Sequence, residues 1–143
     1  MTQTTQLSQD AIFSPMGALV GLTFVVLGLI PFQRFRAAFA GHVKPDDFKY
    51  GESETVPKGV SIPNRNLMNL LEMPLLFYVA CLTLYVTKTV DAPSLYLAWA
   101  YVGLRVVHSV VHLSYNKVVH RLTVFAASNA VLAVIWVRWF LVR

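Results

Sequence analysis

Long apolar runs separated by polar segments make up most of this chain. The runs cover residues 11–35, 66–87, 94–116 and 118–141. Each run is long enough for a helix that crosses a bilayer, which needs about 20 residues. None of them alternates between apolar and polar residues as the strands of a membrane barrel do. The pattern predicts a single all-α integral membrane domain over residues 1–143, built as a bundle of four transmembrane helices.

A polar segment, residues 34–63, separates the first run from the second. It holds basic and acidic side chains together with prolines, and a connection this long is usually functional or disordered. Basic residues near the ends of the runs are more numerous on the side of this segment and of the turn between the third and fourth runs. That side holds Arg34, Arg36, Lys44, Lys49, Lys58, Arg65, Lys117 and Arg121, and the other side holds Lys88, Arg138 and Arg143. Because such residues favour the cytosolic side, we expect both termini outside and the long loop in the cytosol.

The composition agrees with a membrane protein. Of the 143 residues, 56% are hydrophobic and 13% are charged, whereas soluble domains have about 25% charged residues. The net charge of +5 could suggest nucleic acid. Most of this charge falls between apolar runs, however, so membrane topology explains it and no nucleic-acid partner is expected. The single cysteine, Cys81, lies within an apolar run and is expected to be a buried structural residue.

The third run carries polar side chains on one predicted helix face. They follow one another at intervals of four, three, four and three residues: Tyr101, Arg105, His108, His112 and Tyr115. A charged side chain in hydrocarbon costs at least about 2.5 kcal/mol, so we expect this face to contact protein or a water-filled cavity. A polar face inside a membrane run is by default a candidate functional site.

The second run carries a matching polar face near its start. Arg65, Asn69 and Glu72 are spaced by four and three residues, which again places them on one helix face. With a rise of about 1.5 Å per residue, Glu72 lies about 13 Å deep and Arg105 about 15 Å deep from the same side. These two residues are expected to neutralise each other. Arg121, at the start of the fourth run, joins them from that side.

The same residues also have structural interpretations. An ion pair that serves only the fold explains Glu72 and Arg105 as well as ligand binding does. The asparagine and the two histidines can hydrogen-bond in helix packing, and Arg65 and Arg121 can reach lipid phosphates. Two histidines four residues apart can bind a metal, but without an HExxH pattern or a nearby cysteine no metal is expected. Only the joint placement of these residues favours a functional site.

At these residues the sequence resembles the MAPEG family, the membrane-associated proteins in eicosanoid and glutathione metabolism. The segment RNLMNLLEMPLLFY holds the family's Arg-x-x-x-Asn-x-x-Glu pattern as Arg65, Asn69 and Glu72, and LRVVHSVVH is followed by Arg121. The resemblance covers essentially the whole chain and looks most like bacterial members. It implies a homotrimer, here in a bacterial inner membrane, with glutathione held as co-substrate between subunits on the cytosolic side.

The resemblance also implies roles for individual residues. Positions that match the family's glutathione site are Arg65, Asn69, Glu72, Arg105, His108 and His112. Arg121 matches the arginine that contacts the glutathione sulfur and favours the thiolate, which makes it the candidate catalytic residue. In one family branch, tyrosines stand where this chain has His112 and Phe125. Residues 33–36 resemble the glutathione-contacting end of the family's first helix.

Several activities are compatible with this resemblance. Family members conjugate glutathione to hydrophobic electrophiles, reduce lipid hydroperoxides or isomerise a prostaglandin endoperoxide, and one branch binds lipids without catalysis. The implied function is a glutathione-dependent membrane transferase or peroxidase whose second substrate is a hydrophobic small molecule from the lipid. The alternative is a non-catalytic lipid-binding or assembly protein with the same fold.

Overall fold

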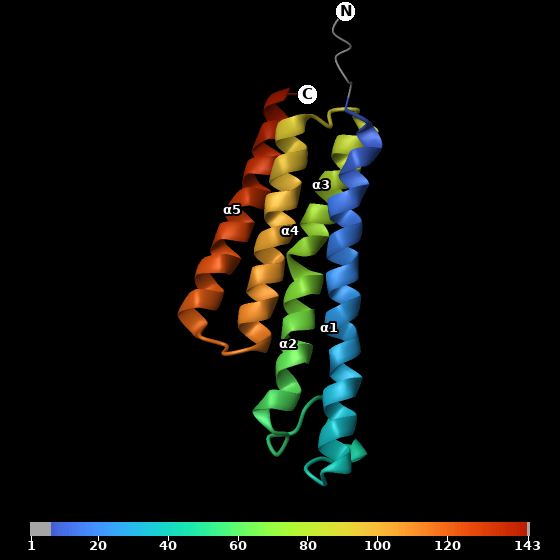
Figure 1. Cartoon of the computed structure of the whole chain (residues 1–143), viewed down its shortest axis with the longest axis vertical. Helices are drawn as coiled ribbons and strands as arrows, with labels where there is room; N and C mark the ends of the chain where they lie inside the picture. Colours follow the sequence, from blue (N-terminus) through green and yellow to red (C-terminus); the bar gives the residue numbers. More distant parts are fainter. Residues whose placement is uncertain (1–6, 143) are drawn as a thin grey trace, which may run out of the picture.

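The computed structural model describes residues 7–142, so the ends of the predicted domain, residues 1–6 and 143, lie outside it. Its helices are α1 (Phe13–Phe39), α2 (Lys58–Glu72), α3 (Pro74–Val86), α4 (Ala92–Leu113) and α5 (Val118–Val142), with short 3-10 helices η1 (Gln9–Ile12) and η2 (Pro45–Phe48). Within the described residues there is no β-strand. Four helical segments are long and apolar enough to cross a membrane, with α2 and α3 forming one of them (Figure 1). The predicted four-span, all-helical membrane bundle is confirmed.

Two helices extend further into the polar segment than the apolar runs predict. Helix α1 continues to Phe39 and α2 begins at Lys58, so the connecting loop is limited to residues 40–57. The 27 residues of α1 span about 40 Å, whereas the hydrocarbon core is about 30 Å thick. Helical hydrogen bonding therefore continues past the end of the apolar composition, and basic residues such as Arg36 lie on a helix that projects towards water.

Pro74 divides the second membrane-crossing segment into two helices. Proline has no N–H to donate to the carbonyl four residues earlier, and its ring crowds the preceding turn. Met73 nevertheless keeps helical backbone angles, φ −68° and ψ −35°. The turn after it closes with a bond from Leu76 N to Met73 O of 3.1 Å. The α-helical hydrogen bonding is therefore interrupted at Met73, and the segment continues as α3.

The bundle is aromatic at its centre and apolar on its outside. Helix α4 packs most extensively against α5, and α1 against α2. In the core, Phe77 of α3 stacks on Tyr101 of α4, with ring centroids 4.5 Å apart and an interplanar angle of 18°. Large apolar side chains such as Phe24, Leu75 and Val110 are exposed on the outer faces. This distribution is that of helices that face lipid.

The two ends of the bundle are built differently (Figure 1). The turn end holds η1, the α3–α4 turn and the end of α5, and the loop end holds the α1–α2 loop and the α4–α5 turn. At the turn end, the Gln9 side chain donates to Val90 O at 3.1 Å and accepts from Val90 N at 3.0 Å. Trp139 Nε1 donates to Thr87 Oγ1 at 3.2 Å. These contacts connect η1, the turn and α5.

Asp91 is the central residue of the turn end. Its carboxylate caps α4 by accepting from Ser94 N at 2.8 Å, and it accepts from Arg138 Nη2 of α5 at 2.9 Å. Burial raises the pKa of Asp91, but the hydrogen bonds from Ser94 and the charge of Arg138 outweigh it and hold the pKa below its ordinary value. Asp91 thus joins the α3–α4 turn to α5.

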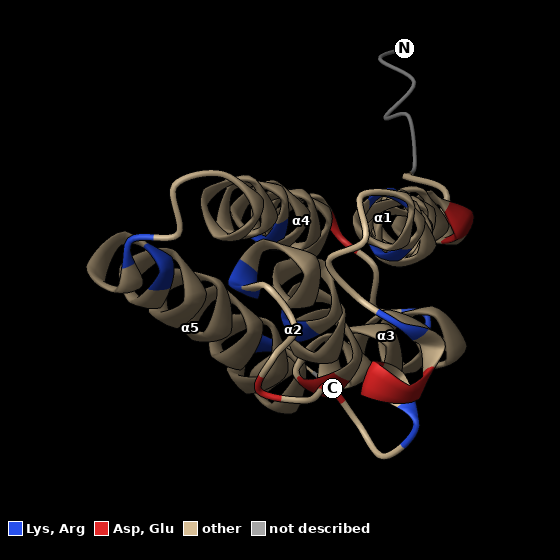
Figure 2. Ribbon diagram, turned by 90° about the horizontal axis from the view of Figure 1, so that it is seen from below, with Lys and Arg blue, Asp and Glu red and all other residues tan. Residues whose placement is uncertain are grey.

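Most basic residues outside the bundle interior lie at the loop end. Figure 2 looks onto this end and shows Lys and Arg on several elements. The basic residues at this end are Arg34, Arg36, Lys44, Lys49, Lys58, Arg65, Lys117 and Arg121. The described part of the turn end carries Lys88 and Arg138. The structure thus gathers at one end the basic residues that the sequence assigns to one side of the membrane.

Candidate functional site

The polar stripe of α4 faces the protein interior. Tyr101 and Arg105 are 0% exposed, and His108 and His112 are each 1% exposed. The prediction that this face contacts protein is confirmed for these four residues. It is wrong for Tyr115, which is 55% exposed, because α4 ends two residues earlier and the turn carries this side chain outwards.

Three helices line a cavity that opens to the surface beside this stripe, near the loop end. The cavity has a volume of about 320 Å³. Its polar lining comes from α2, α4 and the start of α5: Arg65, Asn69, His108, His112 and Arg121. Its apolar lining comes from α5: Val118, Leu122 and Phe125. Five of the seven predicted site residues therefore lie around one space; Glu72 and Arg105 do not line it.

Arg121 is held in place by two acceptors. Its Nη1 donates to Oδ1 of Asn116 at 2.9 Å and to Nε2 of His112 at 3.2 Å. Because a guanidinium has no acceptor, His112 Nε2 must be unprotonated, and the neutral ring carries its proton on Nδ1. The Nε and Nη2 atoms of Arg121 form no hydrogen bond within residues 7–142. The side chain thus presents an oriented cation with donors left for a ligand.

Arg105 lies behind the cavity wall and connects α4 to α2. Its Nη2 donates to the backbone oxygen of Asn69, in the last turn of α2. Its Cζ atom also lies 5.6 Å from the ring centroid of Phe125 on α5, within the range of a cation–π contact. The structure therefore gives Arg105 a role in packing three helices together.

The predicted ion pair between Glu72 and Arg105 is wrong for the single chain. Glu72 is exposed on α2, and the ion pairs among residues 7–142 are those of Arg34 with Glu52 and of Arg138 with Asp91. The rise per residue fixes how deep a side chain lies along a helix, but it does not fix the direction in which the side chain points. The two residues therefore match in depth without making contact.

Nine buried side-chain atoms have no hydrogen-bond partner in the described part of the chain, and six of them belong to α2 and α4. These six are Asn66 Nδ2, Tyr101 OH, Arg105 Nε and Nη1, His108 Nδ1 and His112 Nδ1. A buried polar atom left without a partner costs about 1–3 kcal/mol. Such atoms are expected to bind water or a ligand. No group of three or more metal-ligating side chains occurs within residues 7–142.

A second cavity, of about 460 Å³, adjoins the first at the loop end. The two share Arg65 and Arg121, and the second is otherwise lined mainly by the polar loop and the first turns of α2. Asn116 also lines it. The two arginines therefore stand between an inner cavity with an apolar wall and an outer cavity that carries loop carboxylates.

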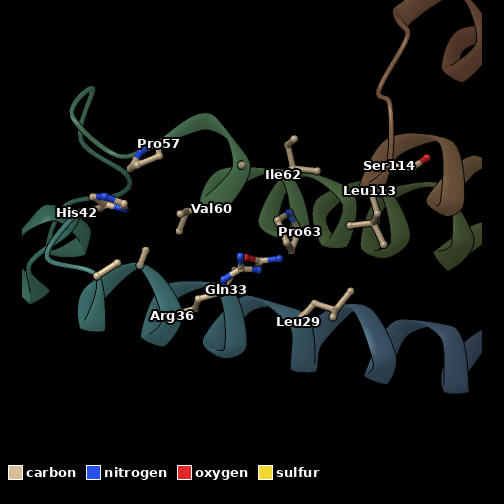
Figure 3. A pocket seen from close by; sticks show the side chains of 13 residues that line it. Leu29, Gln33, Arg36, His42, Pro57, Val60, Ile62, Pro63, Leu113 and Ser114 are labelled. Atoms are coloured by element: carbon tan, nitrogen blue, oxygen red, sulfur yellow. The ribbon is translucent and has the colours of Figure 1, made fainter.

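A third cavity, of about 540 Å³, lies between α1 and α2 (Figure 3). Gln33 and Arg36 of α1 extend into it towards Pro63 of α2. Arg34 instead pairs with Glu52, with Nη2 and Oε1 3.3 Å apart. The end of α1 that resembles a glutathione-contacting segment thus faces a space separate from the cavity that Arg121 lines.

Sequence reasoning did not assign Asn116, Val118 or Leu122 to the site. Asn116 has a φ of +48°, and an asparagine between two apolar runs is a signal for such a turn. Val118 and Leu122 carry no distinguishing signal by themselves, because valine and leucine serve equally well against lipid and against protein. Leu122 follows Val118 by four residues, and Phe125 follows Leu122 by three. This spacing places all three residues on one helix face.

Comparison with known families gives one match over nearly the whole chain. The sequence profile of the MAPEG family matches residues 12–141. No curated protein and no solved structure gives a match. The family's members are membrane proteins of glutathione or eicosanoid metabolism, in agreement with the four membrane-crossing segments. The chain is therefore an integral, multi-pass membrane protein that belongs to the MAPEG family.

Proposed function

We propose that this protein is a glutathione-dependent membrane enzyme that acts on hydrophobic electrophiles or lipid hydroperoxides. The observation that carries the proposal is the convergence of two arginines, an asparagine and two histidines on one cavity with an apolar wall. Glutathione carries two carboxylates and a thiol, so it needs cations and hydrogen-bond donors. A hydrophobic co-substrate needs the apolar wall. The cavity offers both kinds of surface side by side.

Arg121 is the proposed catalytic residue. After the thiol releases its proton to solvent, the guanidinium stabilises the sulfur anion, because it remains charged at any relevant pH. Such stabilisation is strong in a site that excludes bulk water. In the transferase reaction, the sulfur forms a bond to an electrophilic carbon, and the leaving group departs with its electron pair. In the peroxidase reaction, two thiols reduce one hydroperoxide and yield a disulfide, an alcohol and water.

The apolar wall on α5 is the proposed binding surface for the hydrophobic co-substrate. Val118 and Leu122 are exposed on the outside of the bundle as well as lining the cavity. Phe125 lies deeper and packs against His108, with ring centroids 5.8 Å apart. An apolar molecule dissolved in lipid can therefore approach the cavity sideways without crossing water.

We propose a homotrimer whose site faces the cytosol of a bacterial cell. Arg65 and Glu72 are exposed within a membrane-crossing segment, and a charged side chain in hydrocarbon costs at least about 2.5 kcal/mol. A neighbouring copy that covers this face removes that cost, and its Gln33 and Arg36 can complete the glutathione site. The basic loop end favours the cytosolic side. Light scattering of the detergent-solubilised protein, corrected for detergent, tests the trimer.

The alternative is a non-catalytic lipid-binding or assembly protein with the same fold. One observation favours it. His112 Nε2 is already engaged by Arg121 and Phe125 has no polar atom, so neither supplies the hydroxyl that tyrosines supply in one family branch. The cavity would then bind an amphiphile without activating a thiol.

Calorimetry with glutathione and its S-alkyl analogues tests the proposal. We expect wild type to bind both, and Arg121→Leu to bind the S-alkyl analogue far better than it binds the free thiol. Arg138→Leu is the matched control, because it removes the same side chain at the turn end and should bind both ligands as wild type does. A wild-type protein that binds neither compound would refute the proposal, and binding without turnover would favour the alternative.

A further inference from the structure

We propose that Asn116 is a positioning residue that orients the Arg121 guanidinium towards the bound thiol. This inference deepens the proposed function and rests on it. It begins from the hydrogen bond of 2.9 Å from Arg121 Nη1 to Asn116 Oδ1, which joins the α4–α5 turn to the first turn of α5.

The backbone of Asn116 is fixed independently of its side chain. Its N–H donates to the carbonyl of Val111 in the last turn of α4, at 2.9 Å. Its φ of +48° lies in the left-handed region, which asparagine adopts more readily than most residues. The residue is therefore anchored to α4 by its backbone and to Arg121 on α5 by its side-chain carbonyl.

The two residues that accept hydrogen bonds from Arg121 Nη1 line different cavities. His112 lines the inner cavity of about 320 Å³, Asn116 lines the outer cavity of about 460 Å³, and Arg121 lines both. An arginine side chain has many rotamers, so an acceptor on each side restricts the guanidinium to the boundary between the cavities. With Nη1 engaged on both sides, the Nε and Nη2 donors are oriented before a ligand arrives.

The chemistry of Asn116 suits this role. A carboxylate at residue 116 would hold the guanidinium more strongly, but it would offset the positive charge that a thiolate needs. The amide carbonyl orients the cation and leaves its charge intact, as does the neutral imidazole of His112. Orientation of a charged donor before the reaction is the main source of electrostatic stabilisation in enzymes.

Two variants at this position separate the side-chain role from the backbone role. Asn116→Gly adopts positive φ without strain and removes the acceptor. Asn116→Asp keeps an acceptor of the same shape and adds a negative charge beside Arg121. Tyr115→Phe is the control in the same turn: it removes the hydroxyl that bonds to His120 Nδ1 at 3.0 Å, and Tyr115 lines neither cavity.

The experiment measures the pH dependence of thiolate absorbance with glutathione bound, together with kcat and KM for a chlorodinitrobenzene. We expect both Asn116 variants to shift the thiolate titration to higher pH and to lower kcat by about tenfold, the lower end of the effect of one hydrogen bond to a charged group. The KM for the electrophile should stay unchanged, and Tyr115→Phe should titrate as wild type does.

The outcomes separate this inference from the function on which it rests. If both Asn116 variants bind glutathione and titrate as wild type does, Asn116 serves only the turn and the positioning role is refuted. A lowered melting temperature without a shifted titration leads to the same conclusion. If wild type binds no glutathione, the proposed function itself fails and this role fails with it.

Discussion

The two ends of the bundle differ in how completely their polar side chains are hydrogen-bonded. At the turn end, Gln9, Asp91 and Trp139 find partners within the chain and connect η1, the α3–α4 turn and α5. At the loop end, His108 and His112 are buried, yet each keeps a ring nitrogen without a partner among residues 7–142. Within the same described range, Arg138 Nε is a buried donor without a partner at the turn end, so the difference lies in how many side chains are satisfied and not in their complete satisfaction.

This difference indicates which polar residues serve the fold and which serve a ligand. Groups that satisfy one another stabilise the folded chain and need nothing further. Buried donors that lack partners reduce stability unless water or a ligand completes them. Changes at the turn end should therefore alter stability and leave binding intact, whereas changes around the cavity should alter binding and turnover more than stability. Arg105, which supports the cavity wall without lining it, is the expected exception.

The largest effect is expected at Arg105. Arg105→Ala leaves the Asn69 carbonyl without its donor and creates a cavity between three helices, so the free energy of unfolding should fall by about 3–5 kcal/mol. Reversible unfolding in detergent measures the change. A double-mutant cycle with Glu72→Gln should be close to additive, because the two side chains are not in contact. A coupling energy of several kcal/mol would show instead that Glu72 and Arg105 form a direct ion pair.

The second-largest effect is expected on turnover, at Arg121. Arg121→Leu should lower turnover with a hydrophobic electrophile by about 10²-fold, the scale of removing one preorganised donor. Arg121→Lys should recover part of the rate, because it restores the charge without the planar group of donors. Steady-state kinetics on protein with an unchanged melting temperature measures both. A loss of the same size in the turn-end control Arg138→Leu would abolish the distinction between the two ends.

A smaller effect on stability is expected at the turn end. Asp91→Ala removes the cap of α4 and the exposed ion pair with Arg138, so it should destabilise the protein by about 1–2 kcal/mol. Asp91→Asn keeps the cap and should lose less. Thermal unfolding measures the change, and calorimetry with glutathione should show no difference from wild type. Weakened glutathione binding in Asp91→Ala would show that the turn end also influences the site.

The smallest effect is a dependence on pH. Because the folded-state pKa of Asp91 lies below its ordinary value of 3.8, its contribution to stability is fully present above that value. The contribution is lost as pH falls through the folded-state pKa. Acidification below about pH 4 should therefore lower the melting temperature of wild type more than that of Asp91→Asn. If acidification lowers the melting temperature of both proteins equally, the carboxylate charge of Asp91 does not contribute to stability.

The sequence predicted those features that depend on periodicity along a single helix. Apolar runs located the four spans, and the spacing of His108 and His112 identified the buried face of α4. Features that depend on how helices are rotated and bent could not be predicted in the same way. The exposure of Glu72 follows from the direction in which its side chain leaves α2. The contact of Asn116 with Arg121 depends on a turn whose geometry no apolar pattern describes.

The central claim is that the loop end binds a thiol and that Arg121 favours its thiolate. Its most direct test is the ultraviolet absorbance of the thiolate, titrated with pH on wild type and on Arg121→Leu, each saturated with glutathione. We expect wild type to show the thiolate at a pH where free glutathione is still a thiol, and Arg121→Leu to require a higher pH. Identical titration curves for two proteins that both bind glutathione would contradict the claim and would leave Arg121 with a role only in anchoring α5.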